Sequence, residues 1–323
     1  MTSNVSLETP LIDSHIGLYI TIIVSSLSMI ISTFACILII FLTIITPKLH
    51  SPTNLLVSST CLSTLVYLII SIVNSFIFYT DSNSTDWSCR IRAYAYYVSL
   101  NLVIYSYVIQ AISRLFWTVL YKYRYLLTMK CHIRLLILKT IISTLLPLST
   151  LITDHVIFRP LKLCVVPMKY TIHVFYLLSV GFLIPLLIIT ILYAIIYRHI
   201  IRSTANFRRA TRDAEIARNI LILLGIFLLG GIPTVIYVIV SNKTVSSPRS
   251  LFLLAVTAPS VAVASERIMS ILLNKEIRKA LTIQWTARFA SDRLSTTGVQ
   301  PLIFINQSAG RVAYISKLQE IRS

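Results

Sequence analysis

Long runs of apolar residues alternate with short polar segments along most of the chain. Seven runs have the roughly 20 mostly apolar residues that a helix needs to cross a bilayer: 17–45, 54–79, 91–117, 134–157, 171–199, 217–240 and 250–273. They are rich in Leu and Ile and do not alternate apolar with polar positions, so helices are indicated and a β-barrel is excluded. The pattern predicts an all-α membrane protein, a bundle of seven transmembrane helices.

Composition agrees with this class. Hydrophobic residues make up 56% of the chain and charged residues 12%, and the mean hydropathy is +0.82, whereas roughly a quarter of a soluble domain is charged. The net charge of +18 comes mainly from segments after the first, third, fifth and seventh spans. The positive-inside rule then places the N-terminus outside and the C-terminus inside. We therefore expect a multi-pass plasma-membrane protein whose basic residues contact anionic lipid, and no nucleic-acid partner.

Four parts of the chain are expected. Residues 1–16 form an extracellular N-terminus without a cleaved signal peptide, and 17–273 form the transmembrane domain. Residues 274–286 carry apolar positions at i, i+4 and i+8 among basic ones, which predicts a short amphipathic helix on the membrane surface. Residues 287–323 are expected to be a flexible cytoplasmic tail.

Glycosylation and disulfide signals agree with this orientation. Three sequons, at Asn4, Asn83 and Asn242, fall on the outer side. Cys89 and Cys164 are the two cysteines placed outside, where an oxidising compartment favours a disulfide. The alternative is a pair of unpaired outer thiols.

The third span is the segment around which the chain is organised. Twenty-five residues separate Cys89 from Arg114, so a helix would place them about 37 Å apart, one at each membrane face. Taken alone, Arg114 is equally well explained as an anchor at the inner interface.

At this point the chain resembles rhodopsin-like G-protein-coupled receptors over residues 17 to 285. The span number, the orientation, the cysteine pair and Arg114 match in order and spacing. So do PKLHSPTN after the first span, LLNKEIRKAL after the seventh, and residues of the fifth and sixth spans: Pro185, Tyr193, Phe227 and Pro233.

Several family positions are occupied differently. Ser113-Arg114-Leu115 stands for Asp-Arg-Tyr. Glu266 to Ser270 replace the Asn-Pro-x-x-Tyr of the seventh span. Other family residues are replaced as follows: Thr64 for the sodium-binding aspartate, Cys36 for the asparagine of the first span and Gly231 for the tryptophan of the sixth.

Two of these replacements are charged residues inside a span. Glu266 and Arg267 are costly in a membrane and should face polar neighbours. They form either a polar lock between spans seven and two, or a pair in which Arg267 reaches the inner surface and Glu266 is neutral.

The resemblance implies a receptor that binds an extracellular ligand and activates a heterotrimeric G protein through an inner cleft. The residues expected to act there are Arg114, Tyr193, Phe227, Pro233 and Asp213. Pro233, beside the two glycines 230 and 231, would be a soft hinge for span six. Asp213 would pair with Arg114 as an inner latch.

The ligand is expected in the outer half of the bundle. Tyr96, Tyr97 and Tyr176 are pocket candidates, with interfacial anchoring as the alternative. Tyr96 stands where amine receptors carry aspartate, and Ser260 where opsins carry the retinal lysine. Basic residues outnumber acidic ones outside, so a neutral or acidic ligand is favoured; a peptide is preferred and a small chemical comes second.

Other classes remain as alternatives. A transporter or channel would show inverted repeats or Gly-rich broken helices, which are not visible. The six histidines are scattered without HExxH or Cys/His spacing, so we expect no enzyme, metal or cofactor. A receptor-like protein that no longer couples stays open because the motifs of spans two and seven are lost.

Overall fold

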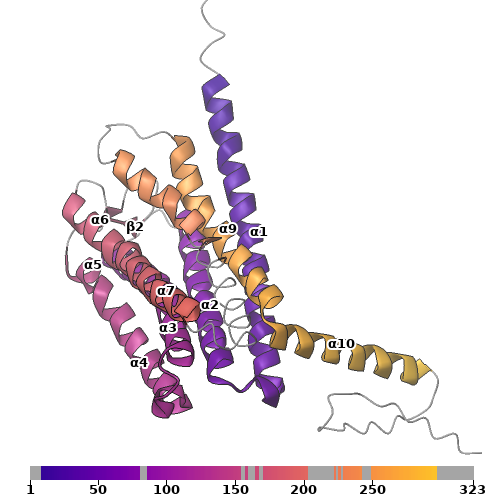
Figure 1. Cartoon of the computed structure of the whole chain (residues 1–323). Helices are drawn as coiled ribbons and strands as arrows, with labels where there is room; N and C mark the ends of the chain where they lie inside the picture. The colour runs from indigo at the N-terminus through magenta and orange to yellow at the C-terminus, as the bar shows by residue number, and fades with distance from the viewer. Residues whose placement is uncertain are drawn as a thin grey trace, which may run out of the picture. The chain divides into compact units, whose positions relative to one another are not determined.

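The structure of the chain is a computed structural model (Figure 1). It describes residues 9–80, 86–153, 157–158, 164–166, 170–202, 222, 225–226, 228–241 and 249–296.

Helices make up most of the described chain. In order, the elements are α1 (Thr9–Ile45), η1 (Pro47–Leu49), α2 (Pro52–Thr80), α3 (Asp86–Thr118), η2 (Arg124–Leu127), α4 (Met129–Leu145), η3 (Leu146–Leu148), α5 (Ser149–Ile152), β1 (Ile157–Phe158), β2 (Cys164–Val165), α6 (Thr171–Leu178), η4 (Ser179–Leu183), α7 (Ile184–Arg202), a helix at Leu228–Ser241, α9 (Arg249–Leu273) and α10 (Lys275–Thr296).

Six predicted spans are confirmed as helices long and apolar enough to cross a membrane. Among the described residues these are Tyr19–Ile45, Pro52–Asn74, Trp87–Thr118, Met129–Ile152, Thr171–Ile201 and Ser250–Leu273. The sixth span in chain order, predicted over 217–240, is described mainly in its second half, as the apolar helix Leu228–Ser241. Its remainder lies largely outside the described residues, so the seven-span bundle is consistent with the structure and its sixth span stays a prediction.

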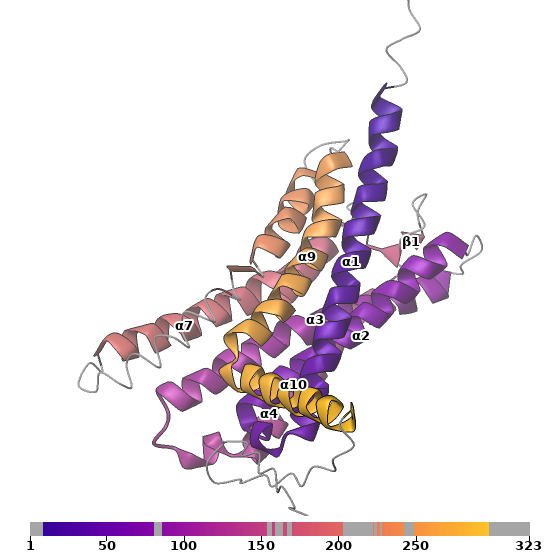
Figure 2. The same ribbon diagram turned by 90° about the vertical axis from the view of Figure 1, so that its right-hand side faces the viewer.

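α3 is the central helix of the bundle. It packs against α2, α4 and α7, and it also contacts both strands of the small sheet. α1 packs against both α2 and α9 (Figure 1), and Figure 2 shows them on its two sides. Groups on α3 can therefore reach most of the other spans.

The outer end of the fourth span differs from the prediction. The span was expected to reach residue 157, but helix ends at Ile152, and Ile157 pairs with Val165 in an antiparallel hairpin. Pro147 already turns the chain into the 3₁₀ segment η3, because proline cannot supply a helical backbone donor. The apolar run thus continues into the outer loop, which sequence length alone does not reveal.

The chain divides into two compact units, Met1–Asn274 and Lys275–Ser323. In the second unit, α10 continues to Thr296, ten residues beyond the predicted end of the helix at 286. Residues 287–296 of the predicted tail are therefore helical. The position of α10 on the membrane surface stays a prediction.

Candidate functional site

Arg114 lies near the C-terminal end of α3, four residues before the helix ends at Thr118. Its neighbour Ser113 is buried, with its Oγ 2.9 Å from Nε2 of His132. The other ring nitrogen, Nδ1, lies 2.9 Å from the carbonyl oxygen of Thr128. A carbonyl only accepts, so Nδ1 carries a proton and donates to Thr128. The residue before Arg114 thus tethers α3 to the start of α4, through a histidine that the sequence did not single out.

Tyr193 of α7 packs near the end of α3 that carries Arg114. It is buried in an apolar cluster with Val108 and Ala111 of α3. Leu115, the residue after Arg114, packs against this cluster. The structure therefore brings the neighbourhoods of Arg114 and Tyr193 together, as their matched spacing indicated.

The remaining predicted coupling residues belong to the sixth span or its inner approach. Pro233 lies in the helix Leu228–Ser241, and the next residue, Thr234, donates a hydrogen bond of 3.0 Å to the carbonyl oxygen of Ala255 in α9. Phe227 and Asp213 lie outside the described residues. The pairing of Asp213 with Arg114 therefore stays a prediction.

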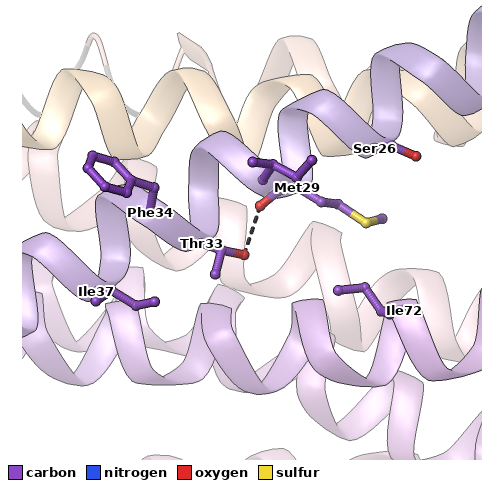
Figure 3. A pocket seen from close by; sticks show the side chains of 7 residues that line it. Ser26, Met29, Thr33, Phe34, Ile37 and Ile72 are labelled. Atoms are coloured by element: carbon purple, nitrogen blue, oxygen red, sulfur yellow. Dashed lines mark hydrogen bonds between the residues drawn. The ribbon is translucent and has the colours of Figure 1, made fainter.

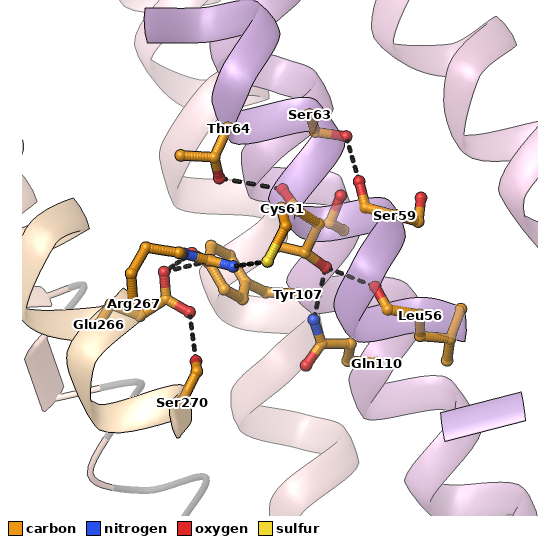
Figure 4. A network of polar contacts seen from close by, with 12 residues as sticks. Leu56, Ser59, Cys61, Ser63, Thr64, Tyr107, Gln110, Glu266, Arg267 and Ser270 are labelled. Atoms are coloured by element: carbon orange, nitrogen blue, oxygen red, sulfur yellow. Dashed lines mark hydrogen bonds and ion pairs between the residues drawn. The ribbon is translucent and has the colours of Figure 1, made fainter. Parts of the chain in front are cut away.

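Glu266 and Arg267 are both buried in α9 and paired with each other. Arg267 is 1% exposed, Glu266 is 4% exposed, and the guanidinium donates to the carboxylate. Arg267 Nη2 also donates to the hydroxyl of Tyr107 on α3 at 2.8 Å, and that hydroxyl donates to Glu266. Ser270 adds a weaker contact to Glu266 at 3.5 Å. Arg267 therefore points into the bundle and does not reach the inner surface (Figure 4).

The network continues to α2. Arg267 Nη1 lies 3.4 Å from Cys61 Sγ, so three helices meet at one guanidinium. On the same stretch of α2, Gln110 of α3 donates a hydrogen bond of 2.6 Å to Thr60. Tyr107 was not predicted, although it stands seven residues before Arg114, two helical turns away on the same face of α3.

Thr64, at the family's sodium position, is buried and donates to the carbonyl oxygen of Thr60 at 2.9 Å. It brings no carboxylate to the bundle interior. In the part of the chain that the structure describes, no three His, Cys, Asp or Glu side chains gather in a way that could hold a metal ion. Arg267 is the charged group that contacts Cys61 of α2.

Lys139 lies within the predicted fourth span, 134–157. It is 3% exposed and lies ten residues into α4, about 15 Å along the helix, where its ammonium contacts two neighbouring helices. The three acceptors are hydroxyl oxygens: Ser63 at 3.0 Å, Ser106 at 3.0 Å and Ser59 at 3.3 Å. Each of its three N–H donors has a partner, so the ammonium can be buried without a carboxylate.

The outer end of α3 is fixed by the predicted disulfide between Cys89 and Cys164. The bridge joins α3 to strand β2. Cys89 is buried together with Ala93 and Val166, and Tyr97 packs on this cluster. The predicted disulfide is therefore confirmed.

The three tyrosines expected in a ligand pocket make different contacts. Tyr96 stacks against Tyr67 of α2, with ring centroids 5.8 Å apart, whereas Tyr97 packs on the disulfide cluster. Tyr176 donates a hydrogen bond of 2.9 Å from α6 to the carbonyl oxygen of Leu146. Tyr96 and Tyr97 touch through their ring edges, so they form a continuous aromatic layer rather than an open site.

Tyr176 lines a hollow of about 660 Å³ between the outer ends of the fourth and fifth spans. At its base, His173 Nε2 lies 3.1 Å from the hydroxyl of Ser149. The other lining residues are Thr153, Tyr170, Thr171 and Ile172. This hollow combines aromatic faces with a few polar groups, as small-ligand sites do.

A second hollow, of about 480 Å³, lies along α1 and α2 (Figure 3). Most of its lining is apolar and strongly exposed, including Ile30, Phe34 and Ile72. Thr33 satisfies its hydroxyl on the carbonyl oxygen of Met29 at 2.8 Å. Such a surface is suited to hydrocarbon, so we assign this groove to the lipid-facing side of the bundle.

The predicted glycosylation sites Asn4, Asn83 and Asn242 lie outside the described residues. Their modification stays a prediction.

Residues 35–265 match the model of one known protein family, described as 7 transmembrane receptor (rhodopsin family). The match covers more than two thirds of the chain. It ends at Ser265, immediately before the buried pair Glu266 and Arg267. Comparison with curated proteins found no match.

Proposed function

Because the chain belongs to the rhodopsin family of seven-transmembrane receptors, we propose that it transmits the binding of an extracellular ligand to a heterotrimeric G protein. Receptors of this kind act by having two arrangements of the bundle, of which the ligand favours one by its differential affinity. The observation that carries the proposal is the two-ended construction of α3. Cys89 is bridged at one end, and Arg114 lies beside the Tyr193 cluster at the other.

The inner end of the bundle is the proposed coupling surface. Arg114 would meet the G protein when the inner half of the sixth span moves away, and Tyr193 would line the same opening. Phe227 and Asp213 are proposed to flank it from the sixth span and its inner approach. The Ser113–His132 bond supports this role because it fixes α3 to α4 directly beside Arg114.

The buried pair Glu266 and Arg267 is proposed as the polar lock of the resting bundle. The guanidinium reaches Tyr107 on α3 and Cys61 on α2, so a movement of α9 relative to either helix must break a charge-assisted bond. In this proposal a tethered cation does the joining that a bound sodium ion does in relatives with the aspartate.

The ligand is proposed to enter from outside and bind between the outer ends of the spans. The hollow beside Tyr176 and His173 supports a small or terminal group of the ligand at the fourth and fifth spans. A peptide with a neutral or acidic end remains the favoured class. The membrane itself is the second partner, along the apolar groove of α1 and α2.

The orientation proposed is extracellular N-terminus and cytoplasmic C-terminus, in the plasma membrane. It rests on the basic inner segments and on the disulfide, which needs an oxidising compartment.

The test is basal G-protein activation in cells that express the wild type, Arg114→Ala or Arg124→Ala at equal surface levels. Arg124 is an exposed basic residue of the same inner side and is the matched control. We expect Arg114→Ala to lower the signal and Arg124→Ala to leave it unchanged. Equal signals from all three would remove Arg114 from coupling. Silence from all three, and from a variant with a loosened lock such as Tyr107→Phe, would favour a receptor-like protein that does not couple.

A further inference from the structure

Gly230 and Gly231 are sites of close helix packing. A β-carbon at residue 230 would overlap that of Ala262 and lie 3.3 Å from the carbonyl oxygen of Ala258, both in α9. At residue 231 it would overlap the ring of Phe182. By contrast, a β-carbon at Gly225 would meet nothing within 4 Å. The two glycines therefore make two specific contacts, one with α9 and one with the fifth span, and the hinge at Pro233 stays a prediction.

The contact at Gly231 concerns the position where the family's sixth span carries a tryptophan. In this chain the space beside the backbone of residue 231 is filled by a side chain of the fifth span. Phe182 supplies the ring, and Gly231 supplies the room for it. The aromatic group is thus retained between spans five and six, but it is attached to the other helix.

Phe182 stands on an unusual backbone. Residues Ser179–Leu183 form the π-helical turn η4 within the fifth span, and such turns are rare and frequent at functional sites. The hydroxyl of Tyr105 on α3 donates a hydrogen bond of 3.1 Å to the carbonyl oxygen of Val180 in this turn. At Gly181, a β-carbon would lie 3.2 Å from Oδ1 of Asn101, so α3 also approaches the turn closely there.

The same Tyr105 connects the turn to the inner cluster. Its side chain packs against the group of residues that includes Tyr193 and Ala111. A shift of η4 would therefore alter two contacts. It would change the seating of Phe182 on the sixth span, and it would change the packing of Tyr105 on the cluster beside Arg114.

We propose that Phe182 is the positioning residue that links the fifth span to the movement of the sixth. Seated against Gly231, its ring holds the sixth span in the resting position, and displacement of the ring with η4 frees that span to move about Pro233. This inference rests on the proposed receptor function. It names the residue that takes over at a position where the chain has lost its tryptophan.

The seating is tested by a pair of substitutions and their combination. Gly231→Ala forces a methyl group into the ring of Phe182, so it should lower the thermal midpoint of the purified receptor in nanodiscs. Phe182→Ala in the same chain should restore much of that loss, because the methyl group then enters vacated space. Two other glycines serve as controls. Gly225→Ala should leave the thermal midpoint unchanged, and Gly230→Ala should lower it without rescue by Phe182→Ala, since the neighbour of Gly230 is α9. Equal effects of Gly231→Ala with and without Phe182 would overturn the contact.

The movement is measured without a G protein. Spin labels on Tyr197→Cys and Ile222→Cys, in a Cys131→Ser background, report the distance between the inner parts of the fifth and sixth spans. We expect Phe182→Ala to shift the population toward longer distances, Gly231→Ala to shift it in the same direction, and Gly225→Ala to match the parent. A Phe182→Ala distribution identical to the parent's would overturn the role of Phe182.

G-protein activation is then compared in the same variants. A longer distance without activation of any G protein would keep Phe182 as the linking residue and remove the proposed coupling function. Normal activation that Phe182→Ala leaves unchanged, together with an unchanged distance, would keep the receptor function and remove Phe182 from it.

Discussion

The guanidinium of Arg267 and the hydroxyl of Tyr107 are joined by a hydrogen bond of 2.8 Å that links α9 to α3. The same hydroxyl donates to Glu266, which in turn accepts from Arg267. The three groups form a closed ring of hydrogen bonds in which the two charged ones are almost fully buried. A bundle interior tolerates such charges only when they are paired and hydrogen-bonded. This ring pairs both charges, while Nε of Arg267 is buried without a hydrogen-bond partner among the described residues.

The first prediction concerns the hydroxyl of Tyr107. Tyr107→Phe leaves the ring of the side chain in place and removes a donor and an acceptor that serve charged partners. We expect the free energy of unfolding to fall by about 1 to 3 kcal/mol, measured as a lower thermal midpoint in nanodiscs. Tyr94→Phe is the control, because that hydroxyl makes a 3.0 Å bond to the neutral carbonyl of Thr144. An equal loss in both variants would contradict a special role for the ring of hydrogen bonds.

The second prediction asks whether the pairing of Glu266 with Arg267, rather than either residue alone, determines stability. Arg267→Met leaves a buried carboxylate without its cation and should cost about 3 to 5 kcal/mol of stability. The double variant Glu266→Gln with Arg267→Met has no net charge to bury, and the amide oxygen can still accept from Tyr107. We expect it to recover most of the surface expression that Arg267→Met loses. A double variant as poorly expressed as the single one would show that the pairing of charges is not the reason.

The third prediction concerns Lys139. We expect that replacing this buried cation costs less stability than replacing one of the serines that accept its hydrogen bonds. Ser63 and Ser106 keep their own donor bonds to the carbonyl oxygens of Ser59 and Leu102. Lys139→Met therefore leaves the hydroxyl donors of these two serines bonded, and replacing a buried cation by an apolar group of similar length is often neutral or stabilising.

Removing an acceptor instead leaves an N–H of the buried ammonium without a partner, at a cost of about 1 to 3 kcal/mol. We expect Ser106→Ala and Ser63→Ala to lower the thermal midpoint more than Lys139→Met does. The opposite order would mean that the charge of Lys139 itself stabilises the bundle.

The fourth prediction concerns the disulfide. The bridge joins cysteines 75 residues apart, a loop for which the chain-entropy model gives about 4 to 5 kcal/mol of stabilisation. Cys89→Ser, Cys164→Ser and the double variant should lower the thermal midpoint equally, and reductant should have no further effect on them. Cys131→Ser, which removes a free cysteine, is the control and should not change the sensitivity of the receptor to reductant. A double variant much less stable than either single one would argue against a shared bridge.

Much of the fold followed from the sequence because apolar length is a strong signal in a membrane protein. The six confirmed spans and the Cys89–Cys164 bridge needed only hydropathy and the sorting of basic residues between the two sides. The end of the fourth span was wrong because the apolar run continues past Pro147 into a hairpin, and hydropathy does not distinguish a helix end from a buried loop.

Less of the site could be predicted from the sequence, because the residues in contact there are far apart along the chain. Arg267 meets Tyr107 and Cys61, which lie 160 and 206 residues away, and nothing in the sequence near residue 267 names them. Lys139 stands near one end of the predicted span 134–157, where a lysine usually places its charge at the membrane surface. That three serines from two other helices surround it could not be read from a single segment. The role of Gly231 likewise depends on Phe182, which comes from another span.

The most direct test of the account is guanine-nucleotide exchange by purified heterotrimers, with the purified receptor in nanodiscs and representatives of each Gα class. We predict that the wild type accelerates GDP release from at least one class over empty nanodiscs, that Phe182→Ala increases this acceleration, and that Arg114→Ala abolishes it. Absence of acceleration by the wild type and by Phe182→Ala, with every class, would contradict the proposal that this receptor couples to a G protein.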